Sequence, residues 1–195
     1  PKPFQSVFPK DRLPEQALQL PVTTPTPRLR AVPGEGTRPI SDRVKESLFN
    51  ILGADIQDAW LLDLFAGTGV LGFELASRGA ARVTLVERSP TLEAQLQRTK
   101  QKLVADSVTI VRGDALAFAR SAREQSFDVV FLDPPFDSDL LEPALLAAAR
   151  LISAEGLIYV ESGAPLDQES AAACGLRVVR AARAGQVHFH LLQRA

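Results

Sequence analysis

A glycine-rich segment between residues 63 and 72 carries the clearest chemical signal in the sequence. It reads Asp-Leu-Phe-Ala-Gly-Thr-Gly-Val-Leu-Gly, so Gly67, Gly69 and Gly72 fall in a G-x-G-x-x-G pattern. The first two glycines allow a tight turn close to a ligand, and the third allows the following helix to pack closely. Glu87 stands twenty residues after Gly67, where its carboxylate could accept hydrogen bonds from a ribose diol. This spacing predicts a site for a nucleoside-containing cofactor.

Asp63 distinguishes between two cofactor classes that fit this motif. A dinucleotide carries a pyrophosphate, which a carboxylate beside the glycine turn would repel. S-adenosylmethionine has no phosphate and carries an ammonium and a sulfonium, which the carboxylate would stabilise. Asp114 could accept from an adenine amino group, or it could simply cap a helix. The residues expected at the cofactor are Asp63, Phe65, Ala66, Gly67, Thr68, Gly69, Glu87, Arg88, Asp114 and Ala115.

A second motif, Asp133-Pro134-Pro135-Phe136, ends the fourth predicted strand. Two consecutive prolines fix φ and remove two donors, which predicts a rigid loop. The Asp133 carboxylate and a backbone carbonyl near Pro134 could accept both N–H bonds of an exocyclic amine, directing its lone pair toward a methyl donor. Phe136 offers a stacking surface for a base taken out of its helix. These four residues are the expected catalytic loop; the alternative is a turn with Phe136 in the core.

Alternating strands and helices are expected to bring both motifs to one edge of a sheet. Short apolar runs predict buried parallel strands at 60–65, 82–87, 107–112, 127–133 and 157–162. Helical periodicity is found over 70–78, 92–103, 115–122 and 139–151. The tail predicts an antiparallel hairpin around Ala184–Gly185. The expected fold is α/β, a doubly wound and mostly parallel seven-stranded Rossmann-like sheet, with ligands at the carboxyl ends of its strands.

The N-terminal part of the chain has a different composition. Nine of the fourteen prolines lie before residue 40, which predicts an irregular arm over 1–39. Ser41 could cap a helix over 42–53. The expected domain organisation is therefore this arm followed by a methyltransferase domain over 40–195. Lys and Arg exceed Asp and Glu in the first 52 residues although the net charge is −1, and this charge pattern decides no function.

Length and composition exclude some classes. With 195 residues, 46% of them hydrophobic and 23% charged, the chain suits one α/β domain. It has no apolar run of the roughly 20 residues that a membrane helix needs, and no apolar signal-peptide segment. The single cysteine, Cys174, fits a reducing compartment, so we expect a cytoplasmic protein. His188 and His190 lack evident partners for a metal site, and Trp60 and Tyr159 are expected in the core.

The sequence resembles bacterial small-subunit ribosomal RNA (guanine-N2)-methyltransferases, a class I S-adenosylmethionine-dependent family. The resemblance covers about residues 29–194. It rests on TRPISDRVKESLFNIL (37–52), DLFAGTGVLGFELASRGA (63–80), VE (86–87), FLDPPF (131–136) and GQV (185–187). It implies S-adenosylmethionine as donor and the N2 amine of one guanine of 16S ribosomal RNA, in a partly assembled small subunit, as acceptor. We expect a monomer.

The resemblance also assigns residues to sites. It implies that Asp63, Gly67, Gly69, Glu87 and Asp114 hold the cofactor and that Asp133–Phe136 form the catalytic loop. It further implies an RNA-binding segment over the mouth of the site, formed by Arg38, Ser41, Asp42 and Arg43. There the two arginines could pair with phosphates or form ordinary salt bridges.

One segment departs from the family pattern. The family usually opens with a basic, glycine-containing hairpin shortly before the Val-Pro that matches Val32-Pro33, where this chain has Pro-Thr-Pro-Arg-Leu-Arg. The RNA-docking surface and the target nucleotide therefore stay open. The residues alone also leave open methylation of adenine N6 or of a protein glutamine. A nicotinamide-dependent oxidoreductase and a non-catalytic RNA-binding module are less favoured.

Overall fold

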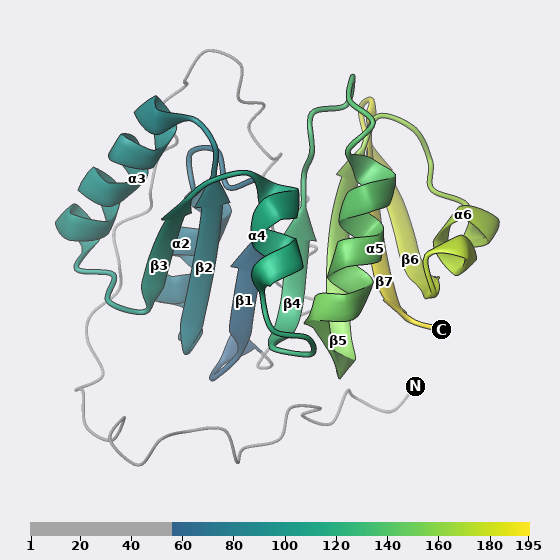
Figure 1. Cartoon of the computed structure of the whole chain (residues 1–195), viewed down its shortest axis with the longest axis horizontal. Coiled ribbons are helices and arrows are strands. Elements are labelled where there is room, and N and C mark those ends of the chain that lie inside the picture. Colours follow the sequence, from purple (N-terminus) through teal and green to yellow (C-terminus); the bar gives the residue numbers. More distant parts are fainter. Residues whose placement is uncertain (1–55) are drawn as a thin grey trace.

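The computed structural model describes residues 56–195, in which seven strands form one sheet with the order β3-β2-β1-β4-β5-β7-β6 (Figure 1). The strands are β1 (Trp60–Asp63), β2 (Arg82–Glu87), β3 (Val108–Arg112), β4 (Phe127–Leu132), β5 (Ile152–Ser162), β6 (Leu176–Ala184) and β7 (Val187–Arg194). The helices are α2 (Val70–Ser77), α3 (Pro90–Leu103), α4 (Ala115–Ser121), α5 (Leu141–Leu151) and α6 (Gln168–Ala173). The expected arm, the helix over 42–53 and the RNA-binding residues Arg38, Ser41, Asp42 and Arg43 lie outside the described residues.

The sheet is parallel from β3 to β5 and antiparallel beyond. β1 pairs in parallel with β2 on one side and with β4 on the other, so the strand order reverses between β1 and β4. β5 pairs antiparallel with β7, and β7 pairs antiparallel with β6. The expected doubly wound sheet with an antiparallel C-terminal hairpin is confirmed.

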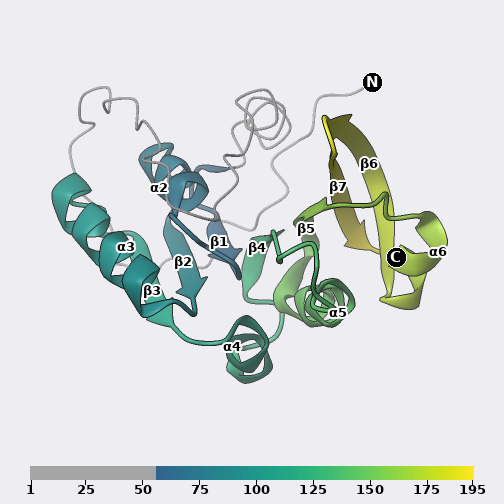
Figure 2. The same cartoon turned by 90° about the horizontal axis from the view of Figure 1, so that it is seen from above.

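Helices cover both faces of the sheet, with α2 on one side and α4 and α5 on the other (Figure 2). Each face has its own hydrophobic core. Along β4, Val129 and Phe131 belong to the core that includes residues of α2 and α3, whereas Val130 and Leu132 belong to the core that includes residues of α4 and α5. Burial on both faces explains why residues 129–132 form a continuous apolar run. Among the described helices, none is long and apolar enough to cross a membrane.

Two strand boundaries differ from the expectation by more than one residue. β1 ends at Asp63 instead of residue 65, because the chain then turns toward α2. β5 begins at Ile152 instead of residue 157 and contains a shift of register against β4, which lies between the pairs Phe127–Ile152 and Val129–Leu157. Residues 153–156, Ser-Ala-Glu-Gly, contain no large apolar side chain, so a search for apolar runs does not detect this early part of β5.

Helix α6 was not predicted. Asp167 caps it, because its Oδ1 atom accepts the Ser170 N–H at 2.8 Å. The helix is short and alanine-rich, and Ala171 is its buried residue. A pattern based on large apolar residues therefore overlooks it.

Gly72 lets α2 pack directly on β2. A Cβ atom on Gly72 would lie 2.3 Å from Leu85 Cδ2 and 3.3 Å from Val83 Cγ1. Both neighbours are almost fully buried, so neither can move away easily. The close packing expected from the third glycine of the motif is confirmed.

We expect Gly72→Val to lower the free energy of unfolding by about 1–3 kcal/mol, because the larger side chain must separate α2 from β2. Urea denaturation followed by far-UV circular dichroism measures the change. Gly113→Val is the matched control, since a Cβ there meets no atom within 4 Å. Equal losses in the two variants would contradict the packing explanation.

Candidate functional site

The two predicted motifs meet at the carboxyl edge of the parallel strands. Asp63 ends β1, Glu87 ends β2 and Asp133 directly follows β4 (Figure 1). This edge lies where the strand order reverses, the usual place for a ligand in an open α/β sheet. The structure thus brings the glycine turn and the Asp-Pro-Pro-Phe loop to neighbouring positions.

The turn between β1 and α2 requires its glycines. Gly67 and Gly69 have φ values of 54° and 72°, in the left-handed region that other residues rarely adopt. The Gly69 N–H donates to the Ala66 carbonyl at 2.8 Å and closes the turn. A Cβ on Gly69 would lie 2.3 Å from Leu96 Cδ2, so α3 also approaches this turn closely.

Glu87 ties the glycine turn to the next loop. Its Oε2 accepts the Gly67 N–H at 2.9 Å, and its Oε1 accepts the Ser89 N–H at 2.7 Å. The sequence predicts a ribose acceptor at Glu87 but does not reveal that its carboxylate also holds the two loops together. A carboxylate has about four lone-pair sites, so the two backbone bonds leave capacity for a diol.

Asp63 is a buried carboxylate at the centre of the edge. Its side chain accepts the Phe65 N–H at 3.2 Å, and the residue is 6% exposed. Burial raises the pKa of Asp63 to about 7, the carboxylates of Asp133 and Glu87 add to this shift, and the Phe65 N–H opposes it. Negative charge is therefore unfavourable here without a cation, and a ligand that brings one would be stabilised.

The remaining residues expected at the cofactor lie around the same edge. Asp114 caps α4, since its Oδ1 accepts the Ala117 N–H at 2.9 Å; the alternative of a helix cap therefore holds, and a contact to adenine would be an additional task. The others follow the strands in sequence: Phe65, Ala66 and Thr68 in the turn after β1, Arg88 after β2, and Ala115 at the first position of α4.

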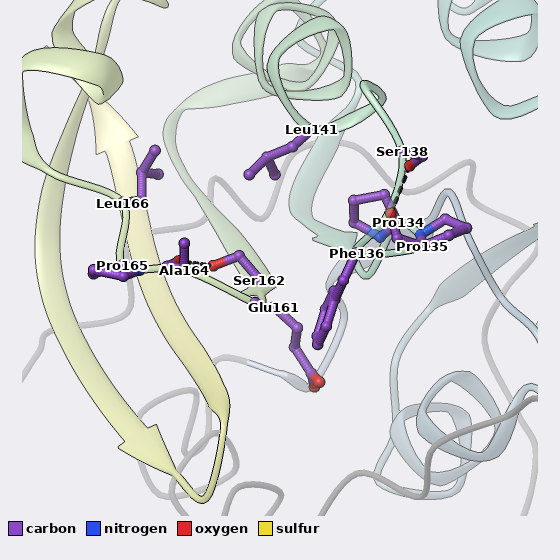
Figure 3. Close-up of a pocket in the computed structure, with 11 residues that line it drawn as sticks. Pro134, Pro135, Phe136, Ser138, Leu141, Glu161, Ser162, Ala164, Pro165 and Leu166 are labelled. Carbon is purple, nitrogen blue, oxygen red and sulfur yellow. Dashed lines mark hydrogen bonds between the residues drawn. The ribbon is translucent and has the colours of Figure 1, made fainter.

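The Asp-Pro-Pro-Phe loop forms one wall of a pocket of about 240 Å³ (Figure 3). The Pro135 carbonyl accepts the Ser138 N–H at 3.1 Å and the Ser138 hydroxyl at 2.5 Å, which fixes the loop. Asp133 is exposed. Phe136 is half-buried, lines the pocket and packs against Gly163, so assigning it to the core is wrong.

The opposite wall comes from the end of β5 and the segment after it, which the sequence had not placed in the site. Glu161 lines the pocket although the residue is only 5% exposed. Its Oε1 accepts the Tyr159 hydroxyl at 2.9 Å. Burial, followed by the proximity of Glu161, raises the pKa of Tyr159. The position of Glu161 at the carboxyl end of a parallel strand was the signal that could have revealed it.

The aromatic and histidine residues noted in the sequence make contacts within the fold. Tyr159 is buried in the core, as expected, whereas Trp60 is half-buried with the Arg82 guanidinium 4.6 Å from its ring centroid. His190 Nε2 accepts the Leu166 N–H at 3.0 Å, and its ring centroid lies 6.4 Å from that of His188. Within residues 56–195, His, Cys, Asp and Glu side chains form no group of three or more that could hold a metal ion.

Comparison with known proteins agrees with this geometry. The sequence model of the family described as Conserved hypothetical protein 95 matches residues 26–193. Ribosomal RNA small subunit methyltransferase D of Escherichia coli is 40% identical over 161 residues, which are 82% of this chain and 80% of that protein. The Haemophilus influenzae protein of the same name is 43% identical over 140 residues, 69% of this chain and 72% of that protein.

A solved structure shows the same fold. The Escherichia coli protein yhhF superposes with a TM-score of 0.73 at 38% identity, covering 85% of this chain and 92% of that one. The resemblance seen in the sequence motifs is therefore confirmed. The chain belongs to the family described as Conserved hypothetical protein 95, the family it shares with the small-subunit ribosomal RNA methyltransferase D proteins.

Proposed function

We propose that this chain transfers the methyl group of S-adenosylmethionine to the N2 amine of a guanine in small-subunit ribosomal RNA. The observation that carries the proposal is the meeting, at one sheet edge, of a buried carboxylate beside a glycine turn with a pocket walled by the Asp-Pro-Pro-Phe loop. The names of the relatives supply the substrate class. The partly assembled subunit, the monomeric state, the cytoplasmic location and the domain boundary at residue 40 remain parts of this proposal.

The residues at β1, β2 and α4 fit S-adenosylmethionine. The buried Asp63 carboxylate suits a cationic group, Glu87 has capacity for the ribose hydroxyls, and Asp114 could accept from the adenine amine. A pyrophosphate would add negative charge beside Asp63, which disfavours a nicotinamide dinucleotide. When bound, S-adenosylmethionine supplies an electrophilic methyl group on its sulfonium.

The Asp-Pro-Pro-Phe loop can make a base amine, which is a weak nucleophile, more reactive. Asp133 and a carbonyl near Pro134 accept the two N–H bonds, so the nitrogen lone pair points toward the methyl carbon. Transfer would form the nitrogen–carbon bond as the carbon–sulfur bond breaks, with S-adenosylhomocysteine as the neutral leaving group, and Asp133 would pass one N–H proton to water. The exposure of Asp133 gives that proton a path to solvent.

Basic side chains near the pocket support a nucleic-acid substrate. Arg183 of β6 pairs in register with His188 of β7, and His188 pairs with Ser162, which lines the pocket. Arg180 and Arg183 are exposed on this strand at the edge of the sheet. Guanidinium groups at these positions can contact phosphates of an RNA whose base enters the pocket.

The direct test is transfer of radiolabelled methyl from S-adenosylmethionine to small subunits from cells that lack this gene, followed by nucleoside analysis. We expect label in N2-methylguanosine. Label only in N6-methyladenosine, or in protein, would overturn the proposed acceptor while keeping a methyltransferase.

Asp133→Ala should lower the rate of methyl transfer about 100- to 1,000-fold, because one preorganised acceptor of the amine is lost. Affinity for S-adenosylmethionine should stay within about threefold, since Asp133 is proposed to contact the base amine and not the methyl donor. Single-turnover kinetics and calorimetry measure the two effects. Asp137→Ala, on the exposed part of the same loop, is the control; an equal loss there would contradict the assigned role.

Asp63→Asn should stabilise the ligand-free protein at high pH while weakening cofactor binding at least about tenfold. The pKa of Asp63 is raised from 3.8 to about 7 on folding, so the wild-type fold loses stability as pH rises through this window. The cost is absent below about pH 4 and reaches about 4 kcal/mol above pH 7. Urea unfolding should therefore show a larger gain for the variant at pH 8 than at pH 5. An equal gain at both pH values would reject this explanation.

Arg183→Ala should weaken RNA binding a few-fold and make the slope of log K against log salt shallower by about 0.9, as expected for one lost phosphate contact. Arg177→Ala is the matched control on the same strand. Arg177 pairs in register with Gln193, at the end of β6 remote from the pocket. If both variants changed the slope equally, β6 would not orient the RNA as proposed.

A further inference from the structure

Three acidic residues stand at the ends of three neighbouring parallel strands. Asp63 pairs with Phe131, and Phe131 pairs with Tyr159, so β1, β4 and β5 are aligned across the sheet. Leu61, Phe131 and Tyr159 belong to the core on the α2 side. Because side chains alternate along a strand, Asp63, Asp133 and Glu161 lie on that same side.

Glu161 is the member of this row that belongs to the pocket rather than to the glycine turn. Leu132 pairs with Val160, so Asp133 and Glu161 occupy the next positions on adjacent strands. Figure 3 shows the Glu161 side chain extending in the same direction as the Phe136 ring. The Tyr159 hydroxyl donates to Oε1 and holds the carboxylate in one orientation. A fixed carboxylate and an aromatic ring therefore line one small space, and Asp133, the expected amine acceptor, follows the neighbouring strand directly before the loop that walls it.

The dimensions and chemistry of this pocket suit one planar base. Its volume of about 240 Å³ lies just below the roughly 300–1,000 Å³ of pockets for drug-sized ligands. Guanine carries an N1–H donor directly beside its N2 amine, whereas adenine carries an acceptor, N1, beside its N6 amine. A carboxylate accepts from the first and repels the second.

We infer that Glu161 is a specificity-determining residue that accepts the N1–H of the target guanine while Asp133 holds the adjacent N2 amine. Tyr159 is its positioning residue. The inference rests on the proposed function and adds the reason that guanine, rather than adenine, enters the pocket. A site that pairs with a substrate donor rejects an analogue lacking it, because the buried partner is then left unsatisfied.

The test uses 2-aminopurine, which keeps the 2-amine of guanine but has an acceptor at N1. Small subunits are assembled with either guanine or 2-aminopurine at the position that the wild-type enzyme labels. We expect the wild-type enzyme to prefer guanine at least about 100-fold in kcat/KM. Glu161→Gln can donate its amide N–H to N1 of 2-aminopurine, so the preference should fall at least about tenfold.

Two further variants make the outcome decisive. Glu155→Gln, on the exposed early part of β5, should keep the wild-type preference. Tyr159→Phe keeps the Glu161 carboxylate but removes its hydrogen bond, so the preference should fall partway; this variant carries the test if Glu161→Gln does not fold. An unchanged preference in both pocket variants would overturn the inference, as would equal losses on the two substrates.

Failure of the proposed function has a different signature. If the wild-type enzyme labels no guanine in any subunit, the acceptor is wrong before a variant is made. If it labels guanine but Glu161→Gln leaves the discrimination against 2-aminopurine intact, methylation of guanine stands and only the role of Glu161 fails.

Discussion

The burial of the Asp63 carboxylate at one edge of the sheet, close to other carboxylates, is the constraint on which the site depends. The parallel register of β1, β4 and β5 places Asp63, Asp133 and Glu161 at neighbouring strand ends on one side. Burial and neighbouring carboxylates raise the pKa of Asp63 to about 7, so folding without a ligand keeps this group partly protonated at neutral pH. A bound cation would offset the cost of burying this charge and the repulsion from its neighbours, whereas a pyrophosphate would add to that repulsion. The proposed choice of cofactor thus follows from the burial of Asp63 at this strand end.

The surrounding structure holds this edge rigid. Glu87 joins the loops after β1 and β2 by accepting hydrogen bonds from their backbone N–H groups. Gly72 has no side chain and therefore lets α2 pack closely on β2. On the other side, Ser138 fixes the Asp-Pro-Pro-Phe loop, and His190 accepts the Leu166 N–H of the facing wall. Donor and acceptor sites are therefore built from rigid strand ends and short fixed loops, which is what alignment of a methyl donor with an amine requires.

The sequence predicted the parts of this structure that depend on local pattern. Buried parallel strands are continuous apolar runs, and the glycines of residues 67–72 have a steric reason to be glycine, so the sheet and the turn were predictable. Glu161 was missed because it resembles an ordinary polar strand end; its place in the pocket depends on the pairing of β5 with β4. The early start of β5 was hidden by its polar bulge, and α6 by its small residues.

The most direct test of the carboxylate constraint is the number of protons released when S-adenosylmethionine binds, measured by calorimetry in two buffers of different ionisation enthalpy. With the pKa of Asp63 near 7 in the ligand-free protein, we expect release of about half a proton per site at pH 7 and of about one proton at pH 5, where the ammonium of the ligand stays protonated. Binding without proton release at pH 7, or comparable affinity for a nicotinamide dinucleotide, would contradict the assignment of Asp63 as the group that selects a cationic methyl donor.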